Sequence, residues 1–450
     1  MSKEINSRFS LPLLLASAVS SALVSTSAVA QNETGGTLEE IIVRARTQEV
    51  NLQDAPVAVS VLSGDNIVKS NIRKLDDFNA YVPGLVVAKN DGAGRVVNIR
   101  GVGWETAQAL TTQPSVLAYI DGVFLANPLA MGLFFGELER IEVFRGPQNT
   151  EFGQGTTGGA INLVTKKPEL DGVKGYLQAG YGTYNAQELQ GMINVPLSDT
   201  LALRVTAQSF ERDGFAEIEG GDLDGYDLDD ADALMGKVGL LWQPSDQLSV
   251  RAQVVAQDSD QGGAAQKNVD DPNPDIRELT QDFPSFFKLS NTSASLIVDY
   301  EVNDKLQIRS LTGYQELEKE QGVDGDRLTE DTFALDLYGF YSYNNWDVLT
   351  FWDNDSEAFS QEFSFVYSAD KLSLTGGIYY LEHENSNYYL EATGPAPFSD
   401  YIPALSNPGP DTLPPFQSVL NFVEERTVTR TNKAIYGQAT YEITDDLMLT

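Results

Sequence analysis

Three glycines, Gly153, Gly155 and Gly158, form the G-x-G-x-x-G pattern with which many proteins approach the pyrophosphate of a dinucleotide. That chemistry needs a helix directly after the glycines, because the amides at the helix N-terminus hold the phosphates. The residues that follow, AINLVTKK (160–167), have the composition of a strand and no helical period. The pattern therefore predicts tight turns or a close backbone approach, and not a nucleotide site.

Other residues suited to catalysis or metal binding are sparse. The chain has no cysteine, which excludes thiolate metal sites and thiol nucleophiles, and its only histidine is His383. We interpret His383 as structural, and we predict a protein that is not an enzyme and holds no metal or other cofactor. Segment 222–232 (DLDGYDLDDAD) has the carboxylate density of a calcium loop without its glycine and terminal glutamate positions. A solvated acidic loop is the favoured interpretation, and a divalent cation at the level of the lipopolysaccharide is the alternative.

The composition and the first thirty residues indicate which partners the protein has and whether it is exported. The formal net charge is −35, so a nucleic acid is excluded as a partner because phosphate binding needs a basic surface. Lys3 and Arg8 precede a short apolar run, 11–24, and an Ala-Val-Ala site at 28–30. Residues 1–30 are therefore predicted to be a signal peptide of an exported protein. No later run approaches the ~20 apolar residues of a spanning helix.

Beyond Gly172 the chain has the pattern of strands joined alternately by short turns and long polar loops. In 248–257, for example, Leu, Val and Ala residues alternate with polar ones. Short turns on one side and long loops on the other are typical of a transmembrane β-barrel with apolar side chains outward and polar ones inward. A soluble sandwich would show the same alternation. The predicted turns are 197–200, 244–247, 302–305, 368–371 and 443–446.

The number of strands suggests an incomplete barrel. About eleven strands fit between Gly172 and Thr450, and the last residues, LMLT, lie within a strand. Plugged outer-membrane transporters have 22 strands. We therefore expect about half of a 22-stranded barrel, the front half of a longer protein.

The run 137–168, ELERIEVFRGPQNTEFGQGTTGGAINLVTKKP, combines a strand, an Arg-Gly-Pro turn, a glycine-rich link and a second strand. It resembles the end of the plug domain of TonB-dependent outer-membrane receptors. Four further motifs follow the order of that family: EEIIVRA at 39–45, YVPGLVV at 81–87, NIRG at 98–101 and YIDGV at 119–123.

The resemblance implies a domain order. Residues 31–50 would be a periplasmic segment with the Ton box, and 51–168 a mixed α/β plug domain with helices near Gly64 and over 74–79. Residues 172–450 would be the N-terminal part of a transmembrane antiparallel β-barrel. The protein would be integral to the outer membrane of a Gram-negative cell, in contact with lipid and lipopolysaccharide.

The first motif, EEIIVRA, occupies the place of the Ton box in this family. The resemblance implies that it pairs as an added strand with TonB, which is energised by the inner-membrane proton-motive force. An ordinary periplasmic strand is the alternative. The predicted TonB-binding residues are Glu39, Glu40, Ile41, Ile42, Val43, Arg44 and Ala45.

Ligand in this family is met by outward plug loops and by the barrel. By position those plug loops are 89–95 and 104–113, with 124–135 as a further candidate. Arg95 and Trp104 are the preferred contacts, because a guanidinium and an aromatic face can hold a chelate or a sugar. The aromatic stretch 333–359 would add stacking side chains, or else belong to the interfacial girdle. Its predicted ligand contacts are Tyr341, Trp346 and Trp352.

Family members anchor the plug through arginines that pair with glutamates of the barrel wall. The positions that match here are Arg100 and Arg145 in the plug, and Glu362 in the wall. In SQEFSF (360–365) the phenylalanines would face lipid, so Glu362 would face the lumen. Burial of such an ion pair costs desolvation energy, so the pair adds little to stability. It is better suited to a latch that holds the plug in place.

The implied function is TonB-dependent active transport of a scarce nutrient across the outer membrane. The most common cargo in the family is a ferric siderophore, and uptake of a carbohydrate or another non-iron nutrient is the alternative. A passive porin-like channel is a third hypothesis, and an adhesin or phage-docking surface is a fourth. The acidic loops argue against strongly anionic ferric chelates as cargo.

Overall fold

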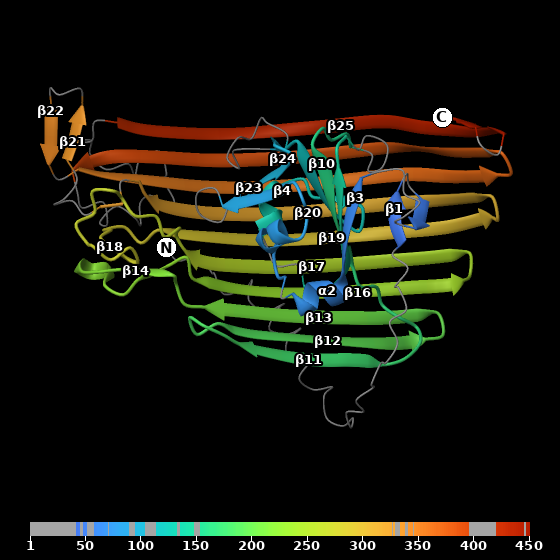
Figure 1. Cartoon of the computed structure of the whole chain (residues 1–450), viewed down its shortest axis with the longest axis horizontal. Coiled ribbons are helices and arrows are strands. Elements are labelled where there is room, and N and C mark those ends of the chain that lie inside the picture. The colour runs from blue at the N-terminus through green and yellow to red at the C-terminus, as the bar shows by residue number, and fades with distance from the viewer. Residues whose placement is uncertain are drawn as a thin grey trace.

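The computed structural model describes residues 42–45, 48–51, 58–70, 72–89, 95–103, 114–132, 136–147, 154–325, 327–328, 334–337, 341–344, 346–395, 420–444 and 447–450. Two parts follow one another along the chain (Figure 1): a small mixed domain, the plug, and a large curved sheet, the wall. The plug lies in front of the middle of the wall in this view.

The plug is built on a five-stranded sheet with the order β3-β9-β10-β7-β8. Only the β10–β7 pair is parallel, so the sheet is mixed, and β3 forms one of its edges. The strands are β3 (Val59–Ser63), β7 (Val116–Ile120), β8 (Val123–Phe124), β9 (Leu138–Arg145) and β10 (Gly159–Thr165).

Smaller elements complete the N-terminal part. The helices are α2 (Gly64–Lys69) and two 3-10 helices, η2 (Leu75–Ala80) and η3 (Pro128–Gly132). A second sheet contains β4 (Leu85–Lys89), β5 (Arg95–Ile99) and β6 (Val102–Gly103), and a hairpin contains β1 (Ile42–Ala45) and β2 (Gln48–Asn51). The helix predicted near Gly64 is confirmed. The helix predicted over 74–79 is a 3-10 helix, in which the Asp77 carboxylate accepts from the backbone amides of Arg73 and Lys74.

Both faces of the plug sheet are buried, and every residue of β10, its polar Asn162 included, is buried. One face, with Ile141, Val143 and Ile161, packs within the plug against α2, η2 and the second sheet. The other face, with Tyr119 and Phe144, packs against the wall. The plug therefore has its own core and a second apolar contact with the wall.

The wall is a single antiparallel sheet of 11 strands in chain order. This number agrees with the prediction from the sequence. The strands are β11 (Lys174–Tyr181), β12 (Gln187–Ser198), β13 (Leu201–Arg212), β16 (Ala231–Ser245), β17 (Leu248–Gly262), β19 (Phe286–Asn303), β20 (Leu306–Asp324), β23 (Trp346–Ala369), β24 (Leu372–Pro395), β25 (Leu420–Thr444) and β26 (Leu447–Leu449).

The predicted turns 197–200, 244–247, 302–305 and 368–371 lie between consecutive wall strands, at the right-hand end of the sheet in Figure 1. The fifth, 443–446, falls between β25 and β26, and its residues 445 and 446 lie outside the described part of the chain. The long connections lie at the opposite end, and parts of them form small β-sheets that are separate from the wall. A three-stranded sheet joins β14 (Ala216–Ile218), β15 (Asp227–Leu228) and β18 (Glu278–Leu279), with η4 (Gly221–Leu223) beside it. A separate hairpin contains β21 (Ala334–Leu337) and β22 (Tyr341–Asn344).

Alternation along the wall strands defines two faces. We call the face that contacts the plug the inner face and the opposite one the outer face. Glu362 is 5% exposed and lies on the inner face, whereas Phe363 and Phe365 are 49% and 41% exposed on the outer face. The predicted parity of this strand is confirmed. Within the described residues, no helix is long and apolar enough to cross a membrane.

The G-x-G-x-x-G pattern has the structural role expected for it. Its last glycine is followed by strand β10 and not by a helix, while Gly153 lies outside the described residues. A side chain at Gly158 would come within 3.0 Å of the carbonyl oxygens of Ser115 and Val102. The glycine lets three plug segments approach one another closely.

Gly159 gives a testable prediction about this packing. A Cβ there would lie 2.3 Å from the carbonyl oxygen of Phe144, and the backbone φ is +153°. We expect Gly159→Ala to destabilise the plug by about 2–4 kcal/mol because both strain and a clash are introduced. Gly172→Ala is the matched control: its φ is +152° but no atom lies within 4 Å. Hydrogen exchange of the plug amides in the intact protein measures both, and equal effects would show that the clash is unimportant.

Candidate functional site

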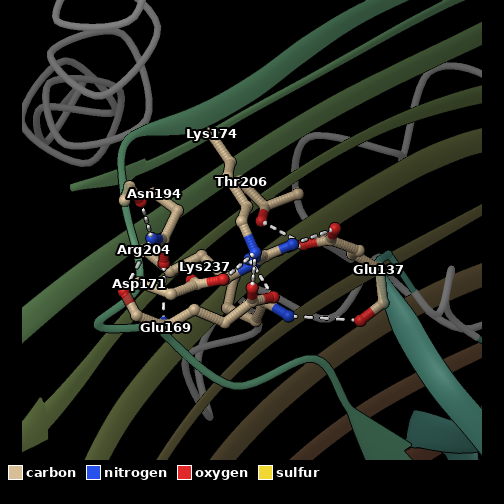
Figure 2. Close-up of polar contacts among 9 residues, drawn as sticks. Glu137, Glu169, Asp171, Lys174, Asn194, Arg204, Thr206 and Lys237 are labelled. Carbon is tan, nitrogen blue, oxygen red and sulfur yellow. Dashed lines mark hydrogen bonds and ion pairs between the residues drawn. The ribbon is translucent and has the colours of Figure 1, made fainter. Parts of the chain in front are cut away.

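A buried ion pair joins the plug to the wall (Figure 2). Glu137, just before β9, is 6% exposed and Arg204, on the inner face of β13, is 3% exposed. The Arg204 Nε donates to Glu137 Oε2 at 2.8 Å and its Nη2 donates to Oε1, so the contact is bidentate. Thr206 Oγ1 donates to the same carboxylate at 3.3 Å, and Lys237 Nζ donates to the Glu137 carbonyl at 3.2 Å.

Strand register explains why these side chains converge. Arg204 and Thr206 are two residues apart on β13 and so share the inner face, and Thr206 pairs with Lys237 of β16. The side chains of Arg204, Lys237 and Thr206 therefore all donate hydrogen bonds to one residue of the plug, Glu137. Every oxygen of the carboxylate has a donor, which is the condition under which a buried ion pair is tolerated.

The link between plug and wall is attached to the same strands. Arg204 Nη1 lies 3.5 Å from a carboxylate oxygen of Glu169. The amide of Glu169 donates to Asn194 Oδ1 at 2.9 Å, and Asn194 Nδ2 returns a bond to the Glu169 carbonyl at 2.9 Å. Lys174 pairs with Glu169 and with Asp171, the latter at 2.9 Å. The plug and its link are therefore both held by β11–β13.

A second ion pair joins the same side of the plug to the wall. The Arg73 guanidinium, which follows α2, lies 3.0 Å from a carboxylate oxygen of Glu188 on β12 and 4.7 Å from the ring centroid of Phe210 on β13. Gln208 Nε2 also donates to Glu188, at 3.2 Å. Arg73, Glu188 and Gln208 line a cavity of about 250 Å³ between α2 and the wall.

The end of the plug that points toward the long loops is held by neutral contacts. The amides of Ala126 and Asn127 donate to Gln315 Oε1 of β20 at 3.0 and 3.4 Å. Asn127 Nδ2 donates to Asn354 Oδ1 of β23 at 3.2 Å. A Cβ at Gly313 would lie 2.2 Å from the Val123 side chain. The absence of a side chain at Gly313 therefore lets strand β8 of the plug pack closely against β20 of the wall. We call residues 126–131 the plug tip.

The three residues predicted to form the latch are not brought together in this state. Arg100 is exposed, and Arg145 is half-buried with no partner for its Nε among the described contacts. Glu362 instead accepts from the Tyr436 hydroxyl at 2.7 Å. It also lies near Tyr119: burial, together with Tyr379 and Glu362, raises the pKa of the Tyr119 phenol well above its ordinary value.

Sequence reasoning missed Glu137, Arg204 and Lys237. Arg204 had a signal, because it lies on the polar face of an otherwise apolar strand and an inward guanidinium needs a carboxylate. Nothing in the sequence identified Glu137 as that carboxylate, since 67 residues separate the two.

Of the predicted ligand contacts, Trp352 is the one whose side chain the structure describes. It is 9% exposed on the inner face of β23, with its ring centroid 5.2 Å from that of Tyr389. Arg95 begins β5 and pairs with Lys89, Tyr341 begins β22, and Trp346 begins β23. Trp104 lies outside the described residues.

The predicted Ton box is described only in part. Residues 42–45 form β1, which pairs antiparallel with β2, Ile42 opposite Asn51 and Ala45 opposite Gln48. Residues 39–41 lie outside the described part of the chain. The hairpin is a separate two-stranded sheet, so β1 has one edge that no other described strand covers.

The acidic segment and the histidine have structural partners. Asp229 and Asp230 accept hydrogen bonds from the amides of Ala265 and Gly262, which tie two long connections together. Within the described residues, no group of three or more His, Cys, Asp or Glu could hold a metal ion. His383 Nε2 is 2.9 Å from Ser356 Oγ across two wall strands.

Residues 51–160 match the model of the TonB-dependent receptor plug domain. In the structure this segment is the mixed domain docked on an antiparallel wall. This segment is a plug domain of the TonB-dependent receptor family. The chain is therefore an outer-membrane protein with a plug domain followed by the strands of a β-barrel.

Relatives agree with this assignment. The chain is 30% identical over 246 residues to the iron-regulated outer membrane virulence protein of Vibrio cholerae, an alignment that covers 52% of this chain and 36% of the relative. It is 28% identical over 197 residues to the pesticin receptor of Yersinia enterocolitica, covering 42% and 28%. The chain thus spans about a third of the length of the curated relatives it matches.

Solved receptors share the fold. The ferric yersiniabactin uptake receptor FyuA from Yersinia pestis superposes with a TM-score of 0.56 at 18% identity, covering 87% of this chain and 63% of that one. The ferripyoverdine receptor of Pseudomonas aeruginosa superposes with a TM-score of 0.63 at 14% identity, covering 90% and 52%. At these identities the likeness concerns the fold alone.

Proposed function

We propose that the intact protein is a TonB-dependent active transporter that carries a ferric siderophore across the outer membrane. The observation that carries the proposal is a folded plug held against the inner wall by the Glu137–Arg204 pair. A passive porin-like channel has no use for such a domain. The names of several relatives refer to iron regulation or to ferric chelates, which supports iron as the cargo.

The order of attachment suggests how the plug moves. The N-terminal hairpin leads into β3, an edge strand that pairs only with β9 in the plug sheet. The two ion pairs that hold the plug to the wall come from Arg73, after α2, and Glu137, before β9. A pull on the N-terminus therefore acts first on an edge strand. We propose that TonB captures the segment 39–45 by strand addition and withdraws β3, which opens a path beside the wall.

The cargo would bind between the plug tip and the long connections. Trp352, above the tip, supports this location, and we propose that Arg95, Trp104, Tyr341 and Trp346 contribute from the plug loops and the outer hairpin region. An iron-free nutrient such as a carbohydrate is the second candidate, since Trp352 and Tyr389 could also stack on a sugar ring.

Deletion of residues 39–45 tests the mechanism. We expect energy-dependent uptake of radio-iron to fall to background in receptor-deficient cells that carry the deletion in the intact protein, while binding of the chelate at the cell surface persists. The intact protein without the deletion, in the same cells, is the reference. Uptake that survives the deletion would contradict TonB dependence, and absence of uptake for every ferric chelate would move the cargo to other nutrients.

A further inference from the structure

Two long connections of the wall fold together into a small unit of their own (Figure 1). Connection 213–230 supplies β14 and β15, and connection 263–285 supplies β18, which pairs parallel with β14. The unit has an apolar core in which Ile218, Leu228 and Leu279 are at most 1% exposed. We call these two connections the loop subdomain.

The loop subdomain contains a lysine that is enclosed by backbone carbonyl groups. Lys267 Nζ donates to the carbonyl oxygens of Asn273, Asp275 and Glu278 at 2.7, 2.5 and 2.7 Å. An ammonium group has three N–H donors, so each donor has its own acceptor. The carboxylate of Asp271, whose side chain is fully buried, lies 3.6 Å from the ammonium and balances its charge. We call the three carbonyls and this carboxylate the carbonyl cage.

The segment that forms the carbonyl cage has the beginning of a calcium-loop sequence. Asp271, Asn273 and Asp275 match the pattern D-x-[DN]-x-[DN], although Ile276 stands where the calcium loop has glycine. The side chains turn to the backbone: Asp271 accepts from the amide of Asn273 at 2.8 Å, and Asn273 accepts from the amide of Asp275 at 2.9 Å. The backbone carbonyls are the groups that face the ammonium, and backbone carbonyls with carboxylates are the oxygen ligands that calcium takes in proteins.

The carbonyl cage needs a cation. Three carbonyl dipoles that converge on one point repel one another, and a buried acceptor without a donor destabilises the protein. The cage is also continuous with the core of the loop subdomain, because Glu278 begins β18 and the next residue, Leu279, is a core residue. The order of this connection therefore depends on the positive charge that the cage encloses.

We propose that the Lys267 ammonium is a built-in replacement for a divalent cation, which keeps the loop subdomain ordered without calcium. Because the ammonium is part of the chain, its place in the carbonyl cage does not depend on the concentration of any ion in the medium. Removal of the Lys267 side chain leaves three carbonyls and the Asp271 carboxylate, a set of oxygen ligands suited to calcium. This inference is independent of the identity of the cargo.

Hydrogen exchange of the intact receptor in detergent, with EDTA or with about 10 mM calcium, tests the proposal. The reporters are the amides of Arg277 and Thr280, which donate to the carboxylates of Asp275 and Asp271. In the unaltered protein they should exchange at the same rate in both media. In Lys267→Met with EDTA we expect exchange that is about ten- to hundredfold faster, because three carbonyls lose their donors. Calcium should restore the slow exchange in this variant, and potassium chloride at the same ionic strength should not.

Lys288→Met is the matched control. Lys288 lies at the same end of the wall, but its side chain is half-exposed and its ammonium lies 3.7 Å from the exposed carboxylate of Asp260. Its loss should leave the exchange of Arg277 and Thr280 unchanged in both media. Slow exchange of β13 and β17, the wall strands next to the loop subdomain, verifies that each variant is assembled.

Three results would overturn the proposal. Slow exchange of Lys267→Met in EDTA would show that the carbonyl cage needs no cation. Fast exchange that calcium does not reverse would show that Lys267 acts through its hydrogen bonds alone. Faster exchange of the unaltered protein in EDTA, which requires no variant, would show that the loop subdomain already depends on a divalent cation.

Discussion

Arg204→Ala is expected to release the plug from the wall strands. The substitution leaves the Glu137 carboxylate 6% exposed and without its bidentate partner, at a cost of about 3–5 kcal/mol in plug docking. Thr206 and Lys237 remain nearby but donate only one bond each to this residue. Hydrogen exchange of β9 and β10 in the intact receptor measures the loss as a fall in protection.

A double variant shows whether the ion pair itself is responsible. The double variant Glu137→Leu/Arg204→Leu removes both charges of the ion pair, while Lys237 keeps its bond to the backbone carbonyl of residue 137. It should therefore recover most of the protection that Arg204→Ala loses. Glu362→Gln separately tests the latch with Arg100 and Arg145 that the sequence predicted; in the structure Glu362 accepts from Tyr436 instead. Full protection in Arg204→Ala would refute the anchor, and unchanged transport in Glu362→Gln would refute that latch.

A disulfide between β3 and β9 is expected to stop energised uptake. Ser60 and Val143 are opposite each other in the antiparallel register, where Cα atoms are about 4.5–5.5 Å apart, a distance that a disulfide can span. The sequence has no cysteine, so Ser60→Cys/Val143→Cys introduces the only pair. Uptake in cells should fall to background when the pair is oxidised and return after reduction, since β3 could no longer leave β9.

A second engineered disulfide provides the control for that experiment. Ala88→Cys/Val96→Cys joins β4 to β5, two strands that also face each other in antiparallel register but lie in the other plug sheet. Withdrawal of β3 alone would leave this hairpin intact, so its oxidation should leave uptake unchanged. If each of the two disulfides abolishes uptake, the whole plug must unfold. If uptake continues with each of them oxidised, withdrawal of β3 is excluded.

The sequence by itself determined the wall strands and their parity. Short turns, strands of alternating polarity and the inward position of Glu362 all follow from a period of two residues, which is a local property. The plug was also recognisable, because the run 137–168 and four further motifs resemble a known family in the same order. The dinucleotide pattern could be dismissed because strand-like residues follow its glycines.

Only the tertiary structure decided which side chains meet. Glu137 and Arg204 are 67 residues apart, and Lys319 and Trp352 share a surface only because β20 and β23 pair in a particular register. In segments 314–321, 352–359 and 382–391, likewise, the strand register places most carboxylates on the outer face and Lys319 on the inner face. Long-range contacts depend on strand register and on plug docking, and neither is encoded in the local periodicity of a strand.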